Sequence, residues 1–84
     1  MSKQDILTEF AEIVREVVGI PVSEVQPDAH LRDDLDIDSL SLVEIMVAVE
    51  DRFGVATPDE IAADLETVDA VLNHIAQYQT AGVA

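Results

Sequence analysis

Ser39 is the residue whose place in the sequence could support chemistry. Asp38 is a favourable N-cap residue, so the pattern predicts that Ser39 begins the helix that follows. Free backbone N–H groups and the positive end of the helix dipole gather there, and both favour a phosphate group. The carboxylates of Asp34, Asp36 and Asp38 oppose it by charge repulsion. The residues alone leave two interpretations open: a serine that carries a phosphate or phosphodiester, and an ordinary polar residue of a first helical turn.

The other reactive side chains do not form a catalytic or metal-binding pattern. His30 and His74 are the only histidines, and Ser39 lacks the Gly-x-Ser-x-Gly setting of a hydrolase nucleophile, so we expect no intrinsic enzyme activity. Three aspartates in residues 34–38 match the first positions of an EF-hand loop. Ser39 and Ile45 stand where that loop requires Gly and Glu, so we expect no dedicated metal site. The chain contains no Cys, which excludes disulfides and thiolate ligands.

The helix predicted over residues 39–53 has two apolar faces. At 100° per residue, one face gathers five apolar side chains: Leu42, Ile45, Met46, Val49 and Phe53. The opposite face carries apolar residues beside carboxylates: Leu40, Val43, Val47, Glu44, Glu50 and Asp51. One apolar face is enough to bury a helix in a bundle, so the second is either covered by the preceding loop or exposed to a partner. Acidic residues in the last turn oppose the helix dipole, which favours a basic partner.

Helix signals also occur before this central helix. Ser2 and Asp5 form a capping-box pattern, and the apolar spacing that follows predicts a helix ending at Gly19. Residues 19–38 then lose the helical period. Their scattered apolar side chains predict a long loop that packs onto the helices.

The last third of the chain predicts a short helix and a longer one. Thr57 is the expected N-cap of the short helix, and Glu60 completes its capping box. The final helix is expected to begin after Thr67 and to bury one face: Val68, Val71, Leu72, Ile75 and Gln79. We therefore predict an all-α fold, a four-helix bundle with a short third helix and a long loop between helices one and two. It should form a single domain over residues 1–84, with a frayed tail at 80–84.

The composition narrows the classes of partner. The 84 residues include 18 Asp and Glu but only 4 Lys and Arg, a formal charge of -14. This charge argues against nucleic acid and anionic membrane surfaces and suits a basic protein partner. Because 49% of residues are hydrophobic, the acidity does not predict disorder. No membrane span or export signal stands out, so we expect a soluble, cytoplasmic monomer without membrane insertion.

Residues 33–44, Asp-Asp-Leu-Asp-Ile-Asp-Ser-Leu-Ser-Leu-Val-Glu, resemble the attachment-site segment of acyl carrier proteins. The resemblance extends from about Glu12 to Ile75 and includes Glu-Asp-Arg-Phe-Gly at 50–54 and Pro-Asp-Glu at 58–60. It is closest to carriers of dissociated (type II) fatty acid synthesis in actinobacteria. The resemblance implies that a phosphopantetheinyl transferase joins 4′-phosphopantetheine from coenzyme A to Ser39. The terminal thiol of this arm would then hold acyl chains as thioesters.

The resemblance also implies which residues partner enzymes contact. The implied face is Asp38, Leu40, Val43, Glu44, Val47, Glu50 and Asp51. The implied partners are acyltransferase, ketosynthase, reductase and dehydratase enzymes with basic docking patches. Acyl chains would lie between the helices, against Ile45, Met46 and Val49.

Three positions depart from the family pattern. Ala56 and Thr57 stand where a basic residue and a bulky aliphatic are usual, and Asp69 replaces a usual glycine. These departures leave the attachment segment intact, but they bear on which acyl chain is carried. A polyketide or other specialised carrier is therefore an alternative, as is an unmodified acidic adaptor domain.

Overall fold

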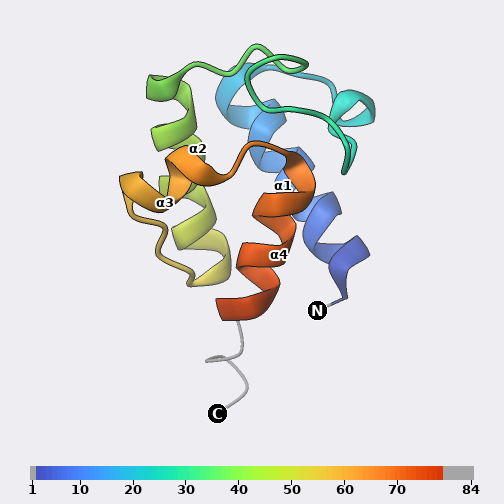
Figure 1. Ribbon diagram of the computed structural model, residues 1–84. Helices are drawn as coiled ribbons and strands as arrows, with labels where there is room; N and C mark the ends of the chain where they lie inside the picture. Colours follow the sequence, from blue (N-terminus) through green and yellow to red (C-terminus); the bar gives the residue numbers. More distant parts are fainter. Residues whose placement is uncertain (1, 79–84) are drawn as a thin grey trace.

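The protein is described by a computed structural model over residues 2–78 and consists of helices joined by loops (Figure 1). The elements in chain order are α1 (Lys3–Val18), a 3-10 turn η1 (Val22–Glu24), α2 (Ser39–Phe53), α3 (Asp59–Asp64) and α4 (Val68–Tyr78). Within the described residues the only β-type pairing is one isolated antiparallel bridge, between His30 and Thr67. The predicted all-α bundle, with its short third helix and long loop after α1, is confirmed.

Both ends of α1 follow from the residues that cap them. The Ser2 hydroxyl accepts a hydrogen bond from the Asp5 N–H at 3.2 Å, and the Asp5 carboxylate accepts one from the Ser2 N–H, which completes the predicted capping box. At the other end, Gly19 adopts a φ of 78°, a left-handed conformation that suits glycine. Its N–H donates to the Arg15 carbonyl at 2.9 Å and closes the helix.

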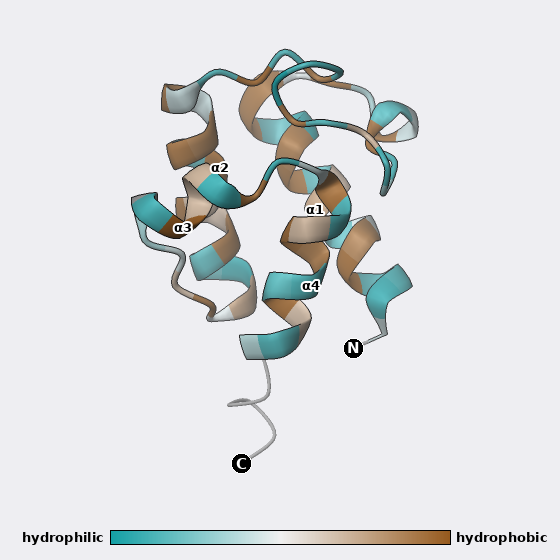
Figure 2. Cartoon of the chain, in the orientation of Figure 1, coloured by the Kyte–Doolittle hydropathy of each residue, from teal (hydrophilic) through white to brown (hydrophobic). Residues whose placement is uncertain are grey.

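The core forms where the apolar faces of the helices meet. Brown and teal bands alternate along the ribbons, as expected for amphipathic helices (Figure 2). The face of α2 predicted to be buried is buried: Leu42, Ile45, Met46, Val49 and Phe53. The long loop also buries apolar side chains: Val25, Leu31, Leu35 and Ile37. This confirms that the loop packs onto the helices, which fixes its position beside the start of α2.

The start of α3 differs from the prediction. Its N-cap is Pro58, and no side chain caps it, so the capping box expected from Thr57 and Glu60 does not form. The reason lies in the backbone, because Pro58 has an extended ψ of 153° and helical geometry begins only at Asp59. Thr57 therefore lies one residue too early, and its buried hydroxyl has no hydrogen-bond partner among the described residues.

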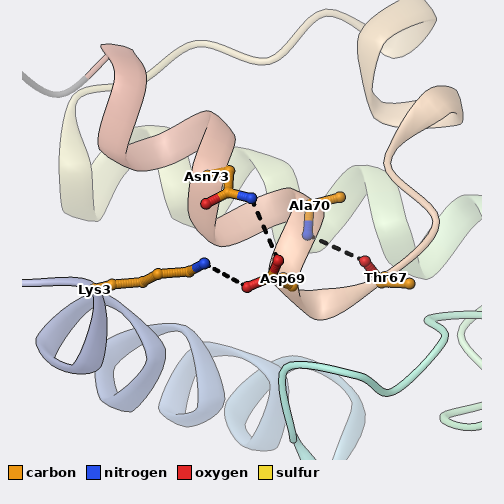
Figure 3. A network of polar contacts seen from close by, with 5 residues as sticks. All are labelled: Lys3, Thr67, Asp69, Ala70 and Asn73. Carbon is orange, nitrogen blue, oxygen red and sulfur yellow. Dashed lines mark hydrogen bonds and ion pairs between the residues drawn. The ribbon is translucent and has the colours of Figure 1, made fainter.

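The start of α4 is tied to both α1 and the loop. The helix begins after Thr67, as predicted, and the Thr67 hydroxyl caps it by accepting a hydrogen bond from the Ala70 N–H at 3.1 Å. Asp69 accepts a hydrogen bond from Asn73 and contacts the Lys3 ammonium group at 2.5 Å (Figure 3). Four of the five residues predicted on the inner face of α4 are buried: Val68, Val71, Leu72 and Ile75. Gln79 and the tail at 80–84 lie outside the described residues.

Candidate functional site

Ser39 is exposed at the first position of α2, as the sequence predicts. Asp38 is the N-cap, and its Oδ1 accepts a hydrogen bond from the Ser41 N–H at 2.8 Å. The Ser39 hydroxyl points to the loop, where its Oγ accepts a hydrogen bond from Nη2 of Arg32 at 3.3 Å. An exposed hydroxyl at a helix N-terminus, beside a cation, has surroundings that suit a phosphodiester.

Two of the three carboxylates near Ser39 accept hydrogen bonds from other groups. The Asp34 carboxylate accepts one from the His30 N–H at 2.7 Å, and this bond is the main reason that the pKa of Asp34 is lowered. The pKa of Asp38 is also lowered, chiefly by the Ser41 N–H, with a smaller contribution from the charge of Arg32. Both carboxylates therefore stay ionised at neutral pH. Their hydrogen bonds come from backbone N–H groups and do not involve the Ser39 hydroxyl, so a phosphate on Ser39 would not remove them.

A tight turn brings Arg32 to Ser39. Asp36 has a φ of 55°, the only positive φ outside glycine among the described residues, and its N–H donates to the Arg32 carbonyl at 3.1 Å. On the other side of Arg32, the N–H of Leu31 donates to Glu66 and its carbonyl accepts from Ile37, both at 2.9 Å. The backbone around Arg32 is thus held by hydrogen bonds both to the turn and to the segment after α3.

A cavity of about 410 Å³ lies next to this turn, between the loop, α2 and α3. Its apolar lining comes from five residues: Leu31, Leu42, Ala62, Ala63 and Leu65. Arg32 belongs to the same lining. The three residues implied as acyl contacts, Ile45, Met46 and Val49, do not line this cavity and instead lie in the core. Contact of an acyl chain with those three residues stays a prediction, and it would require the helices to separate.

The second apolar face of α2 is open to solvent. Leu40 is 74% exposed, Val43 39% and Val47 55%. The loop therefore does not cover this face, and that alternative interpretation is wrong. The carboxylates beside it are exposed as well: Glu44, Glu50 and Asp51. Together with Asp38 these six residues form an acidic, apolar surface along α2, which we call the docking face.

The remaining candidate residues lie apart from Ser39 or in the core. His30 is exposed and lies beside Asp34, whereas His74 is buried, with its ring 4.9 Å from that of Tyr78. Across residues 2–78, no group of three or more His, Cys, Asp and Glu side chains is arranged to hold a metal ion. None of the described helices is long and apolar enough to cross a membrane.

Sequence reasoning missed Arg32 and the cavity. Arg32 lies seven residues before Ser39 in an aperiodic loop, so no helical spacing relates the two side chains. The one available signal was a lone cation within an acidic run. The cavity joins segments up to 36 residues apart (His30 to Glu66), which no local pattern connects.

Comparisons with known proteins agree on one family. Residues 8–75 match the family described as a phosphopantetheine attachment site. The chain is 53% identical over 76 residues to an acyl carrier protein of Acidothermus cellulolyticus, covering 90% of each protein. It is 51% identical over 78 residues to a meromycolate extension acyl carrier protein of Mycolicibacterium aurum, covering 93% of this chain and 80% of that one. The solved apo doublet acyl carrier protein from prodigiosin biosynthesis matches 92% of this chain with a TM-score of 0.76 and 29% identity, and this chain spans 38% of it.

Proposed function

This chain belongs to the acyl carrier protein family, and we propose that Ser39 is the residue that carries its prosthetic group. The prosthetic group of the family is 4′-phosphopantetheine, whose terminal thiol holds acyl chains as thioesters. The chain has no Cys, so the arm is its source of a thiol. The observation that carries the assignment to Ser39 is its exposed hydroxyl at the N-terminus of α2, within the matched residues and within hydrogen-bond distance of Arg32.

Loading requires one substitution at phosphorus. The Ser39 Oγ forms a bond to the coenzyme A phosphorus nearest the pantetheine, the pyrophosphate bridge breaks, and adenosine 3′,5′-bisphosphate leaves. The hydroxyl proton passes to a base of the transferase. The N-terminus of α2 stabilises the negative charge of the phosphodiester that results. The use of coenzyme A supports a cytoplasmic location.

Fatty acid synthesis is the pathway that the relatives favour. Acyl carrier proteins from actinobacteria are 47 to 53% identical to the chain, and several are meromycolate extension carriers. The protein carries acyl intermediates between the enzymes of that synthesis, a role that needs no catalysis by the chain itself. The structural neighbour from prodigiosin biosynthesis keeps a specialised carrier as the second candidate.

Partner enzymes are proposed to bind the docking face. Exposed apolar side chains give such a surface its contact area, and the surrounding carboxylates select basic patches on the partner. Phosphopantetheinyl transferase and the acyltransferase, ketosynthase, reductase and dehydratase enzymes are the expected partners. The net charge of -14 opposes self-association and supports a monomer.

Intact mass after loading tests the proposal. The purified protein is incubated with coenzyme A and a broad-specificity phosphopantetheinyl transferase, beside Ser39→Ala and Ser41→Ala. Ser41 lies about 200° around the helix from Ser39, so it is the matched control hydroxyl. We expect one phosphopantetheine on the wild type and on Ser41→Ala, and none on Ser39→Ala. A folded wild type that accepts no group would instead support an unmodified adaptor that uses the docking face alone.

A further inference from the structure

Arg32 is the basic side chain that contacts Ser39 in the described structure. Lys3 and Arg52 each form an ion pair with a carboxylate, of Asp69 and Glu9 respectively. Arg32, like Arg15, forms no ion pair among the described residues, although the chain carries 18 acidic side chains. The one hydrogen bond of its side chain in the described structure goes to the neutral hydroxyl of Ser39. Its guanidinium therefore has most of its hydrogen-bonding capacity free at the attachment site.

Modification of Ser39 would change what Arg32 faces. The hydroxyl that now accepts one hydrogen bond at 3.3 Å becomes a bridging oxygen of a phosphodiester, with two non-bridging oxygens beside it that share one negative charge. Guanidinium groups bind such paired oxygens through two parallel N–H donors, in charge-assisted bonds that are stronger than bonds between neutral groups. The contact of Arg32 with the serine would therefore become a contact with an anion.

The position of Ser39 on α2 leaves two paths open to an attached arm. At about 100° per residue, Leu42 lies about 60° from Ser39 on one side, and Val43 lies about 40° from it on the other. Leu42 lines the cavity, whereas Val43 belongs to the docking face. The helix alone does not decide between the two paths.

We propose that Arg32 binds the phosphodiester on Ser39 and holds the start of the arm on the cavity side of α2. This inference rests on the proposed attachment at Ser39. Arg32 shares the cavity lining with Leu42, so an anion bound to its guanidinium lies at that side of the helix. The hydrogen bonds of the turn fix the backbone on both sides of Arg32, so its side chain starts from a fixed point within reach of Ser39. Arg32 is thus a positioning residue, which keeps the arm off the docking face until a partner binds there.

Phosphorus and amide resonances of the loaded protein test this inference. Apo and loaded forms of the wild type, Arg32→Gln and Arg32→Lys are compared, with Arg15→Gln as the control that removes an exposed cation from α1. In the wild type we expect the ³¹P resonance to differ from that of the urea-unfolded loaded protein. The difference should be lost in Arg32→Gln, kept in Arg15→Gln and partly restored in Arg32→Lys. Loading should also shift the amides of Ala62 and Ala63 in the wild type, and these shifts should be lost in Arg32→Gln.

The wild type gives a readout that depends on no variant. The Nε–H resonance of Arg32 should shift on loading and return toward its apo position at about 1 M salt, where the Debye length is about 3 Å. A wild type that loads but shows no shift at Arg32, with the same ³¹P resonance as Arg32→Gln, overturns the inference and leaves the attachment intact. A folded wild type that gains no mass overturns the attachment and the inference together.

Discussion

The Lys3 ammonium group lies 2.5 Å from the Asp69 carboxylate, which joins the first turn of α1 to the first turn of α4 (Figure 3). Asp69 also accepts a hydrogen bond from Asn73, and its N–H donates to the Pro27 carbonyl at 2.8 Å. The family resemblance predicts glycine at this position. In this chain Asp69 links α1, the loop and α4.

Replacing Asp69 by Ala should weaken the fold modestly. The ion pair is about half exposed, and such pairs contribute about 0.2–1 kcal/mol, while an acidic residue in a first helical turn contributes about 0.3–1 kcal/mol. We therefore expect a loss of about 0.5–1.5 kcal/mol in urea unfolding. A double-mutant cycle with Lys3→Ala isolates the pair. A coupling free energy of zero at low salt would mean that the ion pair contributes nothing.

Asp36 is strained by its left-handed backbone, so glycine should suit the position better than any residue with a Cβ. A left-handed backbone costs an L-residue about 1–2 kcal/mol, and a short polar side chain such as that of Asp offsets only part of this cost. Asp36→Gly should therefore be more stable than Asp36→Ala by about 1 kcal/mol, measured by chemical denaturation. At Asp33, which has no positive φ, the same pair of variants is the control, and there Ala should be the more stable. The idea fails if both positions prefer Ala.

The ionised carboxylate of Asp38 should make the stability depend on pH. Its pKa is lowered in the folded state, mainly by the Ser41 N–H. A lowered pKa means that the ionised group stabilises the fold above the unfolded-state value of about 3.9, and that this contribution disappears as the pH falls through the lower folded-state value. Asp38→Asn keeps a good N-cap but removes the charge.

Urea unfolding of the wild type and Asp38→Asn across this range provides the measurement. The variant should be the less stable at neutral pH, and the difference should shrink below about pH 4 as the wild-type carboxylate becomes protonated. A difference that persists unchanged in strong acid would show that the carboxylate charge is not its cause.

Most of the helical framework was predictable because its signals are local. Asp38 caps the start of α2 and Gly54 caps its end, both as predicted. An N-cap side chain and a left-handed glycine each act within one helical turn, so their effects can be read from neighbouring residues. The start of α3 was not, because a proline after threonine fits either the N-cap or the first helical position, and the extended backbone at Pro58 decides between them. The local patterns that predict where α2 and α3 begin and end do not predict how these helices pack in the fold.

The position of Ser39, the proposed attachment residue, was easier to predict than its surroundings. Ser39 follows an N-cap and lies in a recognisable segment, whereas Arg32 reaches it only through the turn at Asp36. Exposure of Leu40, Val43 and Val47 was one of two predicted alternatives, and only the path of the loop could choose between them. The contacts of the loop at residues 19–38 depend on its three-dimensional path, and a sequence without helical or strand periodicity does not predict that path.

Charge reversal on the docking face should slow delivery of acyl groups to partner enzymes. Glu44 and Asp51 are both exposed beside the apolar residues of α2, and neither makes a hydrogen bond or ion pair within the described residues that its loss would break. Glu44→Lys or Asp51→Lys should therefore leave the fold intact while it weakens attraction to a basic patch. Such steering raises association rates by about 10-fold or more at low salt and fades as salt is added.

A salt series with one loaded carrier and one partner enzyme, such as a ketosynthase, tests this steering. Glu24→Lys is the matched control, since it makes the same charge change on η1, which packs against α1. We expect kcat/KM to fall for both docking-face variants at low salt, to stay close to wild type for Glu24→Lys, and to converge for all four proteins at high salt. If all variants slow equally, net charge rather than the docking face governs the encounter. If none slows at any salt, electrostatic steering by this face is excluded, and the apolar side chains of Leu40 and Val47 become the next residues to replace.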